Sequence, residues 1–173
     1  KRFAIVSLRL GTDGYRGFVE PERLRKACFE LSRRRIEGYL DVVGRNGSNS
    51  SAKIWECPRS VEEEGRIAAE NLLKLNPQPT AILAASDRLA IGVIETARRH
   101  QLRVPEDLSV VGFDDIPAAK LITPQLTTTN QPLREKGHLA ISSLLDGNGP
   151  LRRKLPSKLV IRHSTAVCPA ESE

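Results

Sequence analysis

Strand-length apolar stretches alternate with segments of helical periodicity along most of this 173-residue chain. This alternation is typical of βαβ units, in which helices cover both faces of a mostly parallel sheet. The sequence therefore predicts an α/β fold with three layers, α/β/α. The expected strands are FAIVSL (3–8), AKIWEC (52–57), PTAILAASD (79–87), LSVVGF (108–113), TTTNQ (127–131) and KLVIRHS (158–164).

Four helices are expected between these strands, and most have a recognisable start. Ser32 can cap a helix over 32–43, and SVEE (60–63) has the pattern of a capping box for the next helix. A third helix is expected over 88–100, and Pro132 suits the first turn of a fourth. The apolar residues that this last helix should bury are Leu133, Ala140, Ile141, Leu144 and Leu145.

The stretch 9–31 shows neither helical nor strand periodicity and is expected to be irregular. Its glycines, in GTDGYRG (11–17), match neither a dinucleotide-binding loop nor a Walker loop, so no phosphate-cradling role and no cofactor is predicted. The cysteines Cys28, Cys57 and Cys168 are odd in number and lack C-x-x-C spacing. This spacing argues against a disulfide framework and a zinc site, so no metal is expected.

Length and charge set broad limits on the class of protein. The chain suits one domain, and its net charge of +6 comes from basic residues scattered along it, which indicates a solvated surface. No apolar run approaches the ~20 residues that cross a bilayer, and the start KRFAIVSL lacks the order of a secretion signal. We therefore expect a cytoplasmic protein without a membrane partner. The absence of Met and the immediate first strand suggest a piece of a longer chain.

Polar residues follow the expected strands at their carboxyl ends, where ligands bind in such sheets. Ser86 and Asp87 follow one strand, and Asp114 and Asp115 follow the next. Each could contact a ligand, and each could instead cap a helix or a turn. Because side chains alternate along an extended chain, at most one of Asp114 and Asp115 faces a shared pocket.

Three consecutive arginines, 33–35, lie in the first turn of the helix expected over 32–43. Cations in the first turn are disfavoured by the helix dipole, by a few tenths to ~1 kcal/mol each. Arg33 and Arg34 are expected to be solvated surface charges. Arg35 adjoins the apolar Ile36 and could reach inward to the site.

An enzyme is the competing class, because carboxylates at strand ends also form hydrolase and phosphotransfer sites. Against it, no histidine or lysine is spaced to activate a nucleophile, and neither a GxSxG motif nor a metal cluster occurs. The histidines, His100, His138 and His163, fall within expected helices or strands. The sequence therefore favours a binding protein.

Three segments carry a resemblance to a known family. The run from PTAILAASD to the helix after Pro132 contains VPEDLSVVGFDD and LTTTNQ, and RRRIEGYLDVV (33–43) and KLVIRHST (158–165) add two further motifs. These resemble the effector-binding domain of the LacI/GalR family of bacterial transcription regulators. The resemblance covers residues 1–165, and only 9–31 departs from it, being longer than the family's usual loop.

The resemblance implies a two-lobed, periplasmic-binding-protein-like (type I) domain, of which this chain is the second lobe. Residues 1–130 and 156–165 would form that lobe, 131–155 would cross to a first lobe outside this chain, and 166–173 would be a disordered tail. Leu133, Ile141 and Leu144 should then be partly exposed. The family's helix-turn-helix headpiece is also outside the chain, so operator DNA would be bound only through it. A sugar-binding receptor of an ABC transporter shares this fold and is the alternative.

Residue roles follow from the same resemblance. Asp114 and Arg35 match effector-contacting positions, Gln131 matches a polar position at the lobe crossing, and contact by Ser86 is less certain. A carboxylate that accepts from hydroxyls and a guanidinium that donates to them suit a sugar or nucleoside. Asp115 would point away and cap the next turn. The resemblance also places four residues at the interface of a homodimer: Ile91, Ile94, Leu121 and Ile122.

Overall fold

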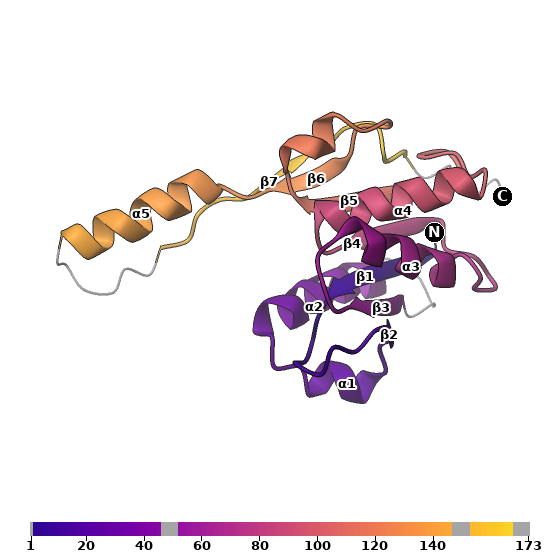
Figure 1. Cartoon of the computed structure of the whole chain (residues 1–173), viewed down its shortest axis with the longest axis horizontal. Coiled ribbons are helices and arrows are strands. Elements are labelled where there is room, and N and C mark those ends of the chain that lie inside the picture. Colours follow the sequence, from indigo (N-terminus) through magenta and orange to yellow (C-terminus); the bar gives the residue numbers. More distant parts are fainter. Residues whose placement is uncertain (1, 46–51, 147–152, 168–173) are drawn as a thin grey trace.

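The structure is a computed structural model that describes residues 2–45, 52–146 and 153–167. Its centre is a seven-stranded sheet in the order β2-β3-β1-β4-β5-β6-β7, parallel except for β2 and β7. The strands are β1 (Phe3–Leu8), β2 (Gly17–Phe18), β3 (Lys53–Cys57), β4 (Ala81–Ala84), β5 (Ser109–Asp114), β6 (Thr127–Asn130) and β7 (Lys158–Val160). The predicted α/β fold with a mostly parallel sheet is confirmed (Figure 1).

Helices pack against both faces of the sheet. On one face lie α3 (Glu62–Leu72) and α4 (Asp87–Arg99), and on the other lies α2 (Glu30–Arg45) together with the short α1 (Pro21–Arg25). The remaining described helices are α5 (Leu133–Leu145) and a 3₁₀ helix, η1, at Pro117–Lys120. Side chains of β1 alternate between the two faces: Ala4 and Val6 join the core beneath α3 and α4, whereas Ile5 packs with Ile36 of α2. The core therefore has two parts, one between each face of the sheet and the helices that cover that face.

Helices α3 and α4 approach each other closely because glycines lie at their contact. A methyl group on Gly65 would lie 2.2 Å from the carbonyl oxygen of Leu89, and one on Gly92 would lie 2.0 Å from that of Glu62. Both contacts are with backbone, which cannot move aside as a side chain can. The close contact of the two helices at Gly65 and Gly92 therefore fixes the position of the start of α4, and of the residues before it, beside the sheet.

The stretch 9–31 is more ordered than its sequence predicts. It contains β2, which pairs antiparallel with β3, and the short helix α1. Two of its arginines form ion pairs with fully buried carboxylates: Arg23 Nε lies 2.5 Å from Glu56 Oε2, and Arg16 Nη2 lies 2.7 Å from Glu64 Oε1. The prediction of an irregular segment is wrong because these contacts are distant in sequence and leave no periodic signal.

Two predicted helix starts are also corrected. Helix α2 begins at Glu30, so Ser32 lies inside it and is buried rather than capping. Helix α3 has Val61 at its N-cap position and no side-chain cap. The capping box fails because the Ser60 hydroxyl instead donates to Ser86 Oγ at 2.8 Å, across to the next strand end.

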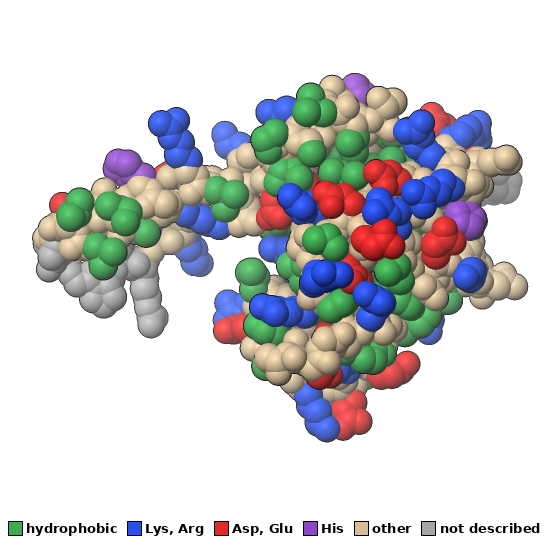
Figure 2. All heavy atoms as spheres, in the orientation of Figure 1, with side chains coloured by type: hydrophobic (Ala, Val, Ile, Leu, Met, Phe, Trp, Pro, Cys, Tyr) green, Lys and Arg blue, Asp and Glu red, His purple; other side chains and the backbone are tan. Residues whose placement is uncertain are grey.

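Helix α5 extends away from the sheet as an arm (Figure 1), and none of its described residues is buried. The expectation that it buries its apolar face within this chain is therefore wrong, and the expected exposure is confirmed. Figure 2 shows hydrophobic side chains along this arm. The exposed fractions are 58% for Leu133, 58% for Ile141, 78% for Leu144 and 80% for Leu145.

Parts of the predicted segments lie outside the described residues. The segment 131–155 is described only to residue 146 and again from 153, and the predicted tail 166–173 only to 167. The last strand, expected over 158–164, ends at Val160. Beyond it the backbone continues to bind the sheet, since the Val110 amide donates to the Ser164 carbonyl at 2.7 Å.

Candidate functional site

The carboxyl ends of four neighbouring strands, β3, β1, β4 and β5, meet at one edge of the sheet. Asp114 is the last residue of β5, and Ser86 and Asp87 follow β4. Arg35 reaches this edge from α2, because its guanidinium donates to the carbonyl of Ala85. The structure therefore brings together the strand-end residues that the sequence singled out.

Asp114 has a strained backbone and a polar partner. Its φ of 123° lies in a region that favours glycine, and non-glycine residues held there are concentrated at functional sites. Its Oδ1 accepts a hydrogen bond from Gln131 Nε2 at 2.7 Å, and Gln131 Oε1 accepts one from Lys136 Nζ at 2.6 Å. Asp114 and the predicted crossing residue Gln131 are thus in direct contact.

The pKa of Asp114 is raised above its ordinary value. Partial burial is the main cause, and the hydrogen bond from Gln131 and the positive charge of Arg35 oppose it. The nearby carboxylate of Asp87 adds to the increase. A half-desolvated carboxylate of this kind gains most from a ligand that donates hydrogen bonds to it.

Arg35 points inward, as predicted, while its neighbours do not. Its guanidinium carbon lies 3.6 Å from the centre of the Phe113 ring, and burial lowers its pKa, with Tyr39 and Asp114 acting in the opposite direction. Arg33 and Arg34 instead form ion pairs with glutamates on the outer face of α2. The planar cation therefore stacks on an aromatic ring beside Asp114.

Ser86 and Asp87 have clear structural roles. Ser86 is the N-cap of α4, where its hydroxyl accepts from the Leu89 amide at 3.3 Å, so the capping alternative is confirmed for it. Asp87 is fully buried, and its two oxygens accept from the Ile116 amide at 2.8 Å and from Thr128 Oγ1 at 2.5 Å. Both hydrogen bonds of Asp87 are made within the chain.

Asp115 diverges from Asp114 but does not cap a turn. Its oxygens accept from Arg162 Nη2 at 2.5 Å and from Asn130 Nδ2 at 3.0 Å, whereas η1 begins without a side-chain cap. Burial tends to raise the pKa of Asp115, but the hydrogen bonds from Arg162 and Asn130 outweigh it and lower that pKa. The predicted cap is wrong because Arg162, from the last segment of the chain, and Asn130 of β6 each take one of the two carboxylate oxygens.

The four residues predicted for a dimer interface differ in accessibility. Ile91 and Ile94 of α4 are 7% and 2% exposed, so both are buried within a single chain. Leu121, directly after η1, is 82% exposed, and Ile122 is half-buried against the core. A partner could reach Leu121 and part of Ile122 without any rearrangement.

A family model described as the periplasmic binding protein-like domain matches residues 17–165. The chain belongs to this family. The resemblance to LacI/GalR regulators is also confirmed: a structure of a LacI family transcriptional regulator from Corynebacterium glutamicum has a TM-score of 0.83 at 29% identity, covering 95% of this chain and 49% of that one.

Other members of the family have names of the same kind. The HTH-type transcriptional regulator Rv3575c of Mycobacterium tuberculosis is 34% identical over 157 residues, which cover 90% of this chain and 42% of that protein. A lac repressor dimer bound to operator and an anti-inducer has a TM-score of 0.77 at 26% identity, covering 96% of this chain and 53% of that one. The chain thus spans about half the length, or less, of the relatives it matches.

Sequence reasoning missed three residues beside the site of this family member. Tyr39 lies one helical turn after Arg35, and burial raises the pKa of its hydroxyl, with Arg35 opposing and Asp114 adding to the increase. The Phe113 ring packs against the guanidinium of Arg35, and Lys136 donates a hydrogen bond to Gln131. The i, i+4 spacing of Arg35 and Tyr39 was the one signal that could have indicated Tyr39.

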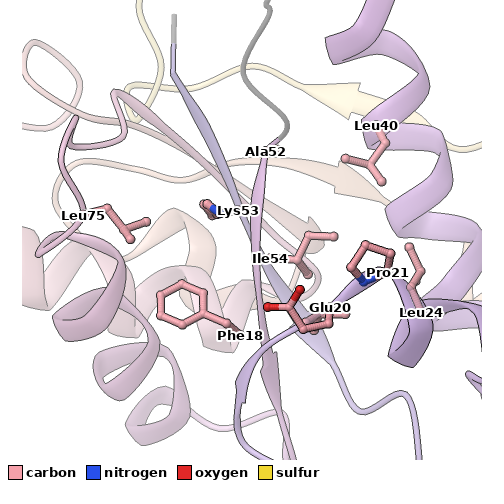
Figure 3. A pocket seen from close by; sticks show the side chains of 10 residues that line it. Phe18, Glu20, Pro21, Leu24, Leu40, Ala52, Lys53, Ile54 and Leu75 are labelled. Carbon is pink, nitrogen blue, oxygen red and sulfur yellow. The ribbon is translucent and has the colours of Figure 1, made fainter.

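A separate hollow of about 520 Å³ lies at the amino end of β3, away from this site (Figure 3). Its walls are mainly apolar, from Phe18, Leu24, Leu40, Ile54 and neighbouring residues, with Glu20 and Lys53 as the charged members. Within the described residues no group of three or more His, Cys, Asp or Glu side chains could hold a metal ion. Nor, in that same part of the chain, is any helix long and apolar enough to cross a membrane.

Proposed function

We propose that this chain is the effector-binding and dimerisation lobe of a cytoplasmic LacI/GalR-type repressor. In this proposal a sugar or nucleoside-like effector contacts Arg35, Asp114 and Gln131, and operator DNA is bound by a headpiece outside the chain. The observation that carries it is the convergence of a half-buried carboxylate, a stacked guanidinium and an amide at the carboxyl edge of the sheet. The three offer both acceptors and donors to the hydroxyl groups of a polyol.

The proposed division into lobes accounts for the exposed arm. Residues 1–130 and 156–165 form the present lobe, and 131–155 crosses to a first lobe, which covers the apolar side chains of α5. A row of exposed apolar side chains on one helix usually marks a surface that another part of the protein covers. The names of the relatives, a transcriptional regulator and a lac repressor, support a regulator over a transporter receptor.

The complete protein that contains these residues should lose or gain operator affinity when its effector is added. A sugar or nucleoside that binds only the native state, at 100 times its dissociation constant, should also raise the free energy of unfolding by ~2.7 kcal/mol. Thermal unfolding and operator binding, measured with the same compounds, test both effects. A compound that stabilises the protein but leaves operator binding unchanged would contradict a regulatory role.

We also propose that the complete protein is a homodimer with Leu121 and Ile122 in a two-fold interface, beside α4 and its Ile91 and Ile94. Light scattering at micromolar concentration should give the mass of a dimer. Leu121→Asp should shift the mass toward the monomer, because a charge would enter an apolar contact. Lys120→Asp, next to it in η1, is the control for added charge, and an unchanged dimer in Leu121→Asp contradicts the assigned patch.

A further inference from the structure

A second hollow, of about 380 Å³, lies at the same edge of the sheet as the proposed effector site. It is lined by Leu8 and Arg9 at the end of β1, by Pro58, Arg59 and Ser60 after β3, and by Ser32 of α2. Ser60 donates to Ser86, which directly follows the Ala85 carbonyl bound by Arg35. The hollow thus adjoins the site that contains Arg35 and Asp114.

The two arginines of this hollow have free hydrogen-bonding capacity. Arg9 stacks on the Phe29 ring, with its guanidinium carbon 4.5 Å from the ring centre, and no described side chain forms an ion pair with it. Arg59 has one distant ionic contact, 3.7 Å from Glu64 Oε1. Stacking fixes the plane of a guanidinium while leaving its N–H groups available to an anion.

The carboxylates nearest to Arg59 are already engaged by other arginines. Glu64 receives two hydrogen bonds from Arg16, at 2.8 and 2.7 Å. Glu63, in the same turn of α3, accepts from Arg66 at 2.8 Å. The positive charge of Arg9 and Arg59 is therefore not balanced by these carboxylates, which are paired with Arg16 and Arg66.

We infer that the effector is an anionic polyol, a sugar or nucleoside that carries a phosphate or carboxylate group, and that Arg9 and Arg59 bind this group. The inference rests on the proposed function, because it assigns the other end of the same ligand to Asp114 and Gln131. Two strand spacings separate the ends of β1 and β5, about 10 Å. The anionic group is thus at one end of the ligand and the hydroxyl groups at the other.

The anion site is tested first with inorganic phosphate, in the complete protein that contains these residues. Phosphate should raise the unfolding temperature above that in chloride at equal ionic strength, and Arg9→Gln with Arg59→Gln should remove the increase. The matched control is Arg98→Gln with Arg99→Gln, which removes the same charge at the exposed far end of α4 and should keep the increase. An increase that survives loss of Arg9 and Arg59, or no increase in the unaltered protein, overturns the inference.

The second test compares ligands that differ mainly in the anionic group: glucose, glucose 6-phosphate and glucuronate; ribose and ribose 5-phosphate; uridine and its monophosphate. The anionic member should bind more tightly by about tenfold to 100-fold, and loss of the two arginines should remove this advantage. Preference for the ester or the acid identifies the group. Equal binding of a neutral member that needs Asp114 overturns the inference and leaves the proposed function standing, whereas no binding by any member contradicts both.

Discussion

Asp114→Asn in the complete protein should weaken effector binding by about 1.5–3 kcal/mol, which is roughly 10-fold to 150-fold in the dissociation constant. Asparagine keeps the size of the side chain and one acceptor oxygen, but it removes the charge. Its amide group also donates where two ligand hydroxyls need an acceptor. Calorimetric titration with the effector measures the change directly.

The stability of the unliganded protein should not fall in the same variant. Burial raises the pKa of Asp114, so its contribution to stability is greatest below the pKa of the unfolded chain and is lost as pH rises through the folded pKa. Burial makes the ionised carboxyl group less favourable in the folded chain than in the unfolded chain, so removing its charge should cost little stability. Thermal unfolding at pH 7 should give an unchanged or slightly higher midpoint for Asp114→Asn.

Asp115→Asn is the matched control, since it makes the same chemical change one residue away. It leaves Arg162 without a charged partner in a pair whose side chains are each 9% exposed, so stability should fall while effector affinity stays the same. Asp114→Asn with full effector affinity would show that Asp114 is not an effector contact.

Arg23→Ala should destabilise the protein by about 3–5 kcal/mol, the range for removing one partner of a buried ion pair. The Glu56 side chain is fully buried and accepts from Arg23 Nε at 2.5 Å and from Arg23 Nη2 at 2.9 Å. Without Arg23, the Leu10 amide, at 2.7 Å, is its one remaining donor among the described residues. Denaturant titration measures the loss.

Arg25→Ala provides the comparison, because it removes an exposed arginine from the same short helix and should change stability by less than about 0.5 kcal/mol. The dependence of stability on pH below about 4 gives a second measurement. Arg23 lowers the pKa of Asp13 to about 2, so the stabilisation from this pair is present above the unfolded pKa and is lost as pH falls from about 4 to 2. Arg23→Ala should abolish that part of the pH dependence, and equal unfolding midpoints for the two variants would contradict the role of the buried pair.

The main sheet could be predicted from the sequence because each of its longer strands is an apolar run between turn signals. The segment 9–31 could not, because β2 and α1 are short and depend on Arg16 and Arg23 reaching carboxylates 48 and 33 residues away. Local rules failed at Ser60 for the same reason. Its hydroxyl bonds to Ser86 rather than to the start of its own helix.

The proposed site was predictable in part. Asp114 and Asp115 have separate partners, as the sequence predicted, but Asp115 lies beyond β5 with a φ of 57°, so strand alternation is not the cause. The choice of Asp114 as the effector contact is a proposal that rests on the resemblance to a known family. The partner of Asp115 could not be inferred, because Arg162 lies 47 residues further along the chain. Tyr39 and Phe113 have ordinary core explanations in the sequence, and the inward path of Arg35 gives them their place beside the site.

The buried carboxylate of Asp87 bears on the entropy of ligand binding. Asp87, at the start of α4, accepts hydrogen bonds from the Ile116 amide, two residues after Asp114, and from the Thr128 hydroxyl of β6. Gly112 leaves room for it, since a methyl group there would lie 2.3 Å from Asp87 Oδ1. These contacts order the chain on either side of Asp114 without a ligand. A ligand that binds at Asp114 would therefore lose little conformational entropy of this segment, whereas such a loss usually reduces the affinity of sites built on loops.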